Sequence, residues 1–128
     1  MSGMKTSFSY TGIRVKDLKR SVDFYTKVLG MKVAGRSKIP IAKGEVVNLV
    51  SEDGGFSLEL NYYNKSSKYN SRYVVGEGLD HLAFKADNLE TLLVEARKMG
   101  YPPVVDMKTD NSRWVYIRDP NGIWIELF

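Results

Sequence analysis

The sequence contains no cysteine, and its only histidine is His81. Without cysteine, the chain can form no disulfide, no thiolate zinc site and no cysteine nucleophile, which fits a reducing cytoplasm. No stretch approaches the roughly 18 apolar residues that a membrane-spanning helix needs. The first ten residues, MSGMKTSFSY, also lack the apolar core of a secretory signal. We therefore expect a cytoplasmic protein with no membrane partner.

The sequence also contains few clusters of like charge. Its 19 basic and 15 acidic residues give a net charge of +4 and are spread along the chain, with the densest basic stretch at 65–72. Nucleic-acid-binding proteins more often carry a concentrated basic stripe, so we expect no nucleic-acid partner. A mild positive bias is better matched by a small anionic molecule. The length of 128 residues allows one domain, built either as one unit or as two half-size modules that share a core.

The chain repeats one order of predicted elements. In the first half, a helix begins at the N-cap Asp17 and ends at Gly30. In the second half, Asp87 with Glu90 suggests a capping box, and the helix ends at Gly100. The predicted strands are 8–15, 31–35, 46–51 and 56–63 in the first half, and 79–85, 104–107, 113–118 and 122–128 in the second.

This repeat predicts an α+β fold made of two βαβββ modules within a single domain, 1–128. Module one spans 8–63, a polar linker spans 64–77, and module two spans 78–128. A sheet covered by one helix keeps an open face, so the two open faces would form a cleft or half-barrel mixed sheet. The paired modules could come from one chain or from two.

Two acids stand inside otherwise apolar strands. Alternation places Glu126 on the face opposite Ile125 and Leu127, and it places Glu59 opposite Leu58 and Leu60. A strand glutamate taken alone usually faces solvent, and a lone strand histidine is usually structural. A buried carboxylate, by contrast, needs a cation, a hydrogen-bond donor or water.

The repeat favours a shared site over the solvent-facing interpretation. Glu59 and Glu126 occupy equivalent places near the ends of the two modules, and Tyr10 and His81 are near-equivalent in the two first strands. Packing about a pseudo-twofold axis would bring all four positions to one cleft. Imidazole nitrogen and carboxylate oxygen suit a divalent metal, with zinc, nickel, cobalt, manganese and iron as candidates.

Three stretches resemble glyoxalase I, a family within the vicinal-oxygen-chelate superfamily: 13–31, 80–84 and 119–127. The resemblance implies four metal ligands, one from each of four equivalent strands. The second, third and fourth match Glu59, His81 and Glu126, whereas the first, a histidine in the family, falls on Tyr10. Tyr10 would then bind as a phenolate, or water would complete a three-residue site, or the chain binds no metal.

The same resemblance implies an activity. A divalent metal, first nickel or zinc, would support isomerisation of the hemithioacetal of a 2-oxoaldehyde and a small thiol through an enediolate. Glu126 is the first candidate for the catalytic base and Glu59 the second. Arg14 matches an arginine that contacts a carboxylate of glutathione, Tyr63 falls on an asparagine that helps to hold glutathione, and Asn61 stands close by. The substrate would thus include a glutathione adduct.

Chains of this type and length usually pair as homodimers. Each site would take Tyr10 and Glu59 from one chain, and His81 and Glu126 from the other.

Other functions remain open within this superfamily. A thioester epimerase uses the same chemistry at its metal, whereas an extradiol dioxygenase needs two histidines for its iron, and this chain has one. The alternative from another class is a metal-free protein that sequesters small molecules. Aromatic residues would line its cleft: Tyr10, Tyr62, Trp114 and Trp124.

Overall fold

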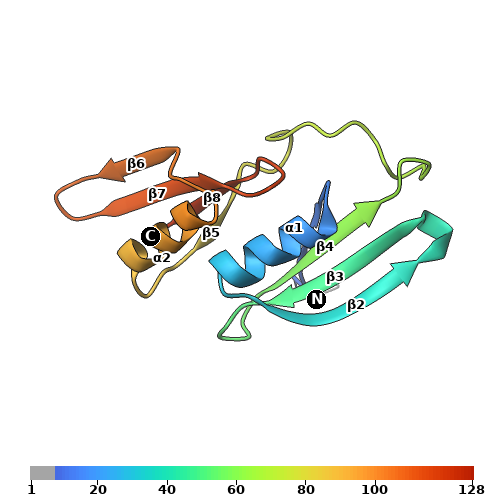
Figure 1. The fold of residues 1–128 in the computed structure, drawn as a ribbon, viewed down its shortest axis with the longest axis horizontal. Helices are drawn as coiled ribbons and strands as arrows, with labels where there is room; N and C mark the ends of the chain where they lie inside the picture. The colour runs from blue at the N-terminus through green and yellow to red at the C-terminus, as the bar shows by residue number, and fades with distance from the viewer. Residues whose placement is uncertain (1–7) are drawn as a thin grey trace, which may run out of the picture.

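Two four-stranded mixed sheets lie side by side in the computed structural model, which describes residues 8–128 (Figure 1). The first sheet has the order β1-β4-β3-β2 and the second β5-β8-β7-β6, and in both the first and last strands of the module run parallel. The first sheet contains β1 (Thr11–Arg14), β2 (Lys32–Ile39), β3 (Gly44–Val50) and β4 (Ser57–Tyr63). The second contains β5 (His81–Phe84), β6 (Val105–Lys108), β7 (Arg113–Arg118) and β8 (Trp124–Leu127). The predicted α+β fold of two βαβββ modules is confirmed.

The helix of module one begins and ends where the sequence predicts. The carboxylate of Asp17 accepts a hydrogen bond from the backbone N–H of Arg20 at 3.0 Å, which caps α1 (Leu18–Asp23). The helix continues as a π-helical turn, η1 (Phe24–Val28), and stops at Gly30, whose positive φ of 75° suits glycine.

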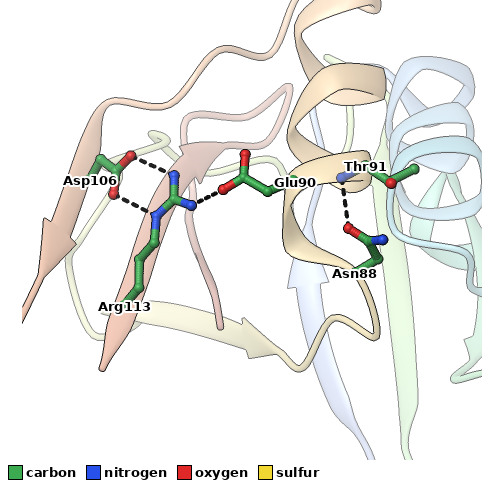
Figure 2. A network of polar contacts seen from close by, with 5 residues as sticks. All are labelled: Asn88, Glu90, Thr91, Asp106 and Arg113. Carbon is green, nitrogen blue, oxygen red and sulfur yellow. Dashed lines mark hydrogen bonds and ion pairs between the residues drawn. The ribbon is translucent and has the colours of Figure 1, made fainter. Parts of the chain in front are cut away.

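The predicted cap of the second helix is wrong by one residue. The N-cap of α2 (Leu89–Lys98) is Asn88, whose side-chain oxygen accepts a hydrogen bond from the N–H of Thr91 at 3.1 Å (Figure 2). Glu90 therefore stands one position too early to form a capping box. It contacts Arg113 instead, and the guanidinium of Arg113 also holds both carboxylate oxygens of Asp106, at 2.9 and 3.1 Å.

Two strands differ most from their predicted bounds, while the others begin and end within two residues of them. The first strand is shorter than 8–15, because 8–10 lie outside the ladder with β4. The second strand is longer than 31–35 and continues to a 3₁₀ turn, η2 (Pro40–Ala42), that leads into β3. Most β2 side chains are exposed on both faces, so no apolar alternation marked this part of the strand.

One hydrophobic core unites the two modules. It takes the inward face of each sheet, including Leu60 and Ile125, together with Phe24 and Tyr25 of η1 and Leu93 of α2, all of them buried. On the opposite face, the side chains of β4 and β8 are half-buried or exposed. Within residues 8–128, no helix is both long enough and apolar enough to cross a bilayer.

A buried polar cluster also ties the modules together. The turn between β7 and β8 contains Asp119 and Asn121, which are only 4% and 2% exposed. Oδ2 of Asp119 accepts a hydrogen bond from the hydroxyl of Tyr25 at 2.8 Å. Nδ2 of Asn121 donates to the hydroxyl of Ser21 at 3.0 Å, and Oδ1 of Asn121 accepts from the N–H of Lys16 at 2.8 Å. This turn of module two is thereby fixed to the helix of module one.

Candidate metal and substrate site

Strand register makes the predicted donor positions equivalent in the two modules. Glu59 is paired with Gly12, and Glu126 is paired with Ala83. Tyr10 precedes Gly12 by two residues, and His81 precedes Ala83 by two residues. Because residues two apart in a strand share a face, His81 lies on the strand next to Glu126 and on the same face of the second sheet. Tyr10 directly precedes β1, and its ring lies on the side of Gly12 to which a side chain there would point, the face of Glu59.

In module two, His81 and Glu126 are half-buried, and both have polar neighbours. The carboxylate of Asp80 lies 2.6 Å from Nδ1 of His81. A carboxylate accepts hydrogen bonds, so this contact favours the tautomer with the hydrogen on Nδ1, in which Nε2 is the lone-pair donor. The hydroxyl of Tyr116, directly opposite Glu126 on β7, donates to Oε1 of Glu126 at 3.0 Å. This hydrogen bond to Glu126 is the main cause that raises the pKa of Tyr116 above its usual value.

In module one, Tyr10 and Glu59 form the corresponding pair. Tyr10 is 51% exposed, whereas Glu59 is half-buried in β4. A side chain built at Gly12 would meet the ring of Tyr10 and the amide of Asn61, so both lie over the same face of the sheet. The residue opposite Glu59 is Asn48 of β3.

The two pairs do not converge within one chain. Among residues 8–128, no three histidine, aspartate or glutamate side chains lie close enough together to hold a metal ion. Glu59 belongs to the first sheet, which Tyr10 directly precedes, and His81 and Glu126 belong to the second. One chain therefore presents two half-sites, each with two potential donors.

Two cavities lie along β1. The larger, about 380 Å³, opens between β1 and the linker, with Arg14 and Arg72 in its lining. The smaller cavity has a volume of about 180 Å³, and Val15 is its one aliphatic lining residue. Its other lining side chains are three cations and four further polar groups: Arg14, Lys16 and Lys65, and Tyr62, Tyr63, Asn70 and Tyr73. None of Glu59, His81 and Glu126 lines either cavity. No carboxylate lines the smaller cavity, so its side chains favour an anionic group.

The three predicted substrate-binding residues lie near this smaller cavity. Arg14 and Asn61 are paired across β1 and β4, and Tyr63 follows Asn61 by two residues on the same face. The amide of Asn61 donates to the carbonyl of Ile13 at 3.3 Å, so it also joins the two strands. Glu59 precedes Asn61 by two residues, roughly 7 Å along the strand, which connects the half-site of module one to the cationic end of the face.

Sequence reasoning missed the residues that hold Arg14. The guanidinium donates to the hydroxyl of Ser71 at 3.0 Å and lies 5.0 Å from the ring centre of Tyr73, which Lys16 also approaches at 4.6 Å. Ser71 and Tyr73 belong to the stretch interpreted as a polar linker. Its tyrosines were the available signal, because large aromatic rings in a polar segment usually pack against something.

Comparison with known proteins places these features in a family context. The model of the glyoxalase/bleomycin resistance protein/dioxygenase superfamily matches residues 7–127. The lactoylglutathione lyase of Escherichia coli O157:H7 is 33% identical over 123 residues, which cover 92% of this chain and 88% of that enzyme. The uncharacterised protein YwbC of Bacillus subtilis is 31% identical and is covered over 98% of both chains. The structure of the trypanothione-dependent glyoxalase I of Leishmania major is 32% identical, covers 97% of this chain and 86% of its own, and superposes with a TM-score of 0.75.

Proposed function

Because this chain belongs to the glyoxalase/bleomycin resistance protein/dioxygenase superfamily, we propose that it is a metal-dependent lyase that isomerises the hemithioacetal of a 2-oxoaldehyde and a small thiol. One observation carries the proposal: strand register pairs Glu59 with Gly12 and Glu126 with Ala83, and Tyr10 and His81 precede these two residues by the same two positions. Relatives named as lactoylglutathione lyases add support.

The donor set fits a divalent cation when two half-sites meet. His81 offers Nε2, and Glu59 and Glu126 offer carboxylate oxygens, a combination that suits nickel or zinc, while cobalt, manganese or iron could also bind. Tyr10 is the weakest donor, because a phenol must lose a proton whose ordinary pKa is about 10 before it binds a metal well. Three protein ligands then leave room for substrate oxygen or water.

A homodimer would supply the complete site. Each site would combine Tyr10 and Glu59 of one chain with His81 and Glu126 of the other, since Glu59, His81 and Glu126 do not form one cluster within residues 8–128. Two such sites follow from one twofold axis, because an isologous contact repeats itself.

The side chains then have separate tasks. A bound cation would polarise the substrate carbonyl as a Lewis acid. Glu126 takes the proton from the carbon that bears sulfur and returns it to the neighbouring carbon, with Glu59 as the second candidate for this step. Arg14 binds a carboxylate at the other end of the thiol, a glutathione adduct in the first instance, with Asn61 and Tyr63 beside it. The product is a hydroxyacyl thioester, with no net oxidation.

The test combines cation binding with turnover. Tag-free apo protein is titrated calorimetrically with zinc and with nickel, and lyase activity is assayed on the methylglyoxal–glutathione hemithioacetal. We expect wild type to bind and turn over. Glu126→Gln should lower kcat by about 10²–10⁴-fold. Tyr10→His should bind the ion more tightly than wild type, because it supplies an imidazole in place of a phenol.

The competing function is metal-free binding of a small molecule, which the exposed phenol of Tyr10 favours. A protein that binds neither ion, and gains no affinity from Tyr10→His, belongs to that class. A protein that binds the ion but acts only on the carbon beside a thioester is the epimerase alternative.

A further inference from the structure

One side chain, that of Tyr116, contacts both potential metal ligands of module two. Its hydroxyl donates to Oε1 of Glu126 at 3.0 Å, and its ring meets the ring of His81 edge to face, with centroids 5.6 Å apart and planes at 85°. The ring of Trp124 packs against it at 5.3 Å. Tyr116 is therefore held by its neighbours, and it can in turn restrict the Glu126 carboxylate and the His81 ring.

The counterpart of Tyr116 in module one is different. Asn48 pairs with Glu59 in the same register as Tyr116 with Glu126, yet within residues 8–128 the Asn48 amide makes no hydrogen bond to Glu59. Strand pairing alone thus does not require a donor at this position. Of the two glutamates, Glu126, the first candidate base, accepts a hydrogen bond from a hydroxyl, and among residues 8–128 Glu59 does not.

We propose that Tyr116 is a positioning residue for the site proposed above, on which this inference rests: it holds Oε1 of Glu126 and the ring of His81, so that Oε2 and Nε2 are ordered before a cation or substrate arrives. A hydrogen bond to an ionised carboxylate is among the stronger ones. A side chain that is ordered in advance loses less rotamer freedom on binding. Groups that orient metal ligands typically change cation affinity by about 10–100-fold when they are removed.

The first experiment isolates the hydroxyl. Tyr116→Phe keeps the ring beside His81 and Trp124 but removes the donor to Glu126. Tyr101→Phe is the matched control, because it removes a phenol hydroxyl from a ring that packs on Phe24 and the hydrophobic core. Tag-free apo proteins are titrated with zinc and with nickel, and kcat and KM are measured with the methylglyoxal–glutathione hemithioacetal.

We expect Tyr116→Phe to weaken zinc and nickel binding by about 10–100-fold and to lower kcat, with KM little changed because Arg14 is intact. Tyr101→Phe should behave as wild type in both assays. The thermal midpoint of the apo Tyr116→Phe protein should stay within about 3 °C of wild type, which separates positioning from general stability.

His81 supplies an independent readout because it is the only histidine. In wild type, its ring signals in nuclear magnetic resonance spectra should shift on addition of zinc. If they do not, the proposed function and the positioning role are both wrong. If wild type binds zinc at His81 and Tyr116→Phe binds it within about two-fold as tightly, the proposed function stands and the positioning role is overturned. A loss of affinity matched by a large fall in thermal midpoint would also overturn it.

Discussion

The hydroxyl of Tyr25 donates a 2.8 Å hydrogen bond to Oδ2 of Asp119, a residue 94 positions further along the chain. Both side chains are buried, and the bond joins the helix of module one to the β7–β8 turn of module two. Oδ1 of Asp119 accepts from the N–H groups of Asn121 and Ile123, at 2.8 Å each. A buried carboxylate is thus satisfied entirely by donors from the protein, which makes each donor costly to remove.

Tyr25→Phe should therefore destabilise the protein. The variant keeps the buried ring but removes one donor to Asp119, and a buried polar group that loses its partner costs about 1–3 kcal/mol. The free energy of unfolding, measured in urea, should fall by that amount. Tyr101→Phe, which leaves the Asp119 cluster intact, should change it much less. If the free energy of unfolding fell equally in Tyr25→Phe and Tyr101→Phe, the hydrogen bond to Asp119 would contribute no specific stability.

The same pair predicts a dependence of stability on alkaline pH. Burial, and then the charge of Asp119, raise the pKa of Tyr25 well above 10 in the folded protein. Below about pH 10 the phenol is neutral in both states, and its contribution to stability is fully present. Above that pH the unfolded chain loses the proton first, so the folded state binds more protons and stability falls as pH rises towards the folded pKa.

Urea unfolding at several pH values from 8 to 11 would measure this fall. Tyr25→Phe should lose stability less steeply than wild type, by up to about 1.4 kcal/mol per pH unit for one titrating group. If the free energy of unfolding fell equally with pH in wild type and in Tyr25→Phe, the fall would not come from Tyr25.

The sequence predicted the modules and the equivalent places of Glu59 and Glu126 for the same physical reason. Alternation in the strands that contain Glu59 and Glu126 is strong because one face of each is buried, so the order of elements and the equivalence of the two glutamates could be inferred. The helix stops at Gly30 and Gly100 were likewise predictable, since both glycines adopt a positive φ.

Other features depend on contacts that leave no local pattern. The extension of β2 to Ile39 is set by pairing with β3, while its side chains are exposed on both faces. The contact of Tyr116 with Glu126 follows only from register, which places the two residues opposite each other. The hydrogen bond from Tyr25 to Asp119 joins residues of different modules, and no sequence spacing predicts it.

The corrected start of α2 gives a third prediction. Asn88 accepts a hydrogen bond from the N–H of Thr91, whereas Asp87 lies one residue outside the helix (Figure 2). Asn88→Ala should lower the free energy of unfolding by about 1 kcal/mol. Asp87→Ala is the matched control and should change it by less than about 0.5 kcal/mol. If Asp87→Ala lowered the free energy of unfolding more than Asn88→Ala, Asp87 would be the N-cap, as the sequence suggested.

The last prediction tests whether two chains share each site. In the proposed homodimer, Glu59→Gln and Glu126→Gln each damage both sites, because every site takes one of these glutamates from each chain. In a mixed dimer of the two variants, one site contains both substitutions, and the other contains neither. If the chains are exchanged by unfolding and refolding an equal mixture, half of the dimers are mixed. About one quarter of all sites should then be intact.

Lyase activity should accordingly rise from near zero in either variant alone to about one quarter of wild type in the refolded mixture. Refolding the variants separately and mixing them afterwards, without exchange, is the control and should give no gain. If each site were built within one chain, every site would retain one substitution and activity would not return in any mixture. A monomer in light scattering at micromolar concentration would exclude the shared site directly.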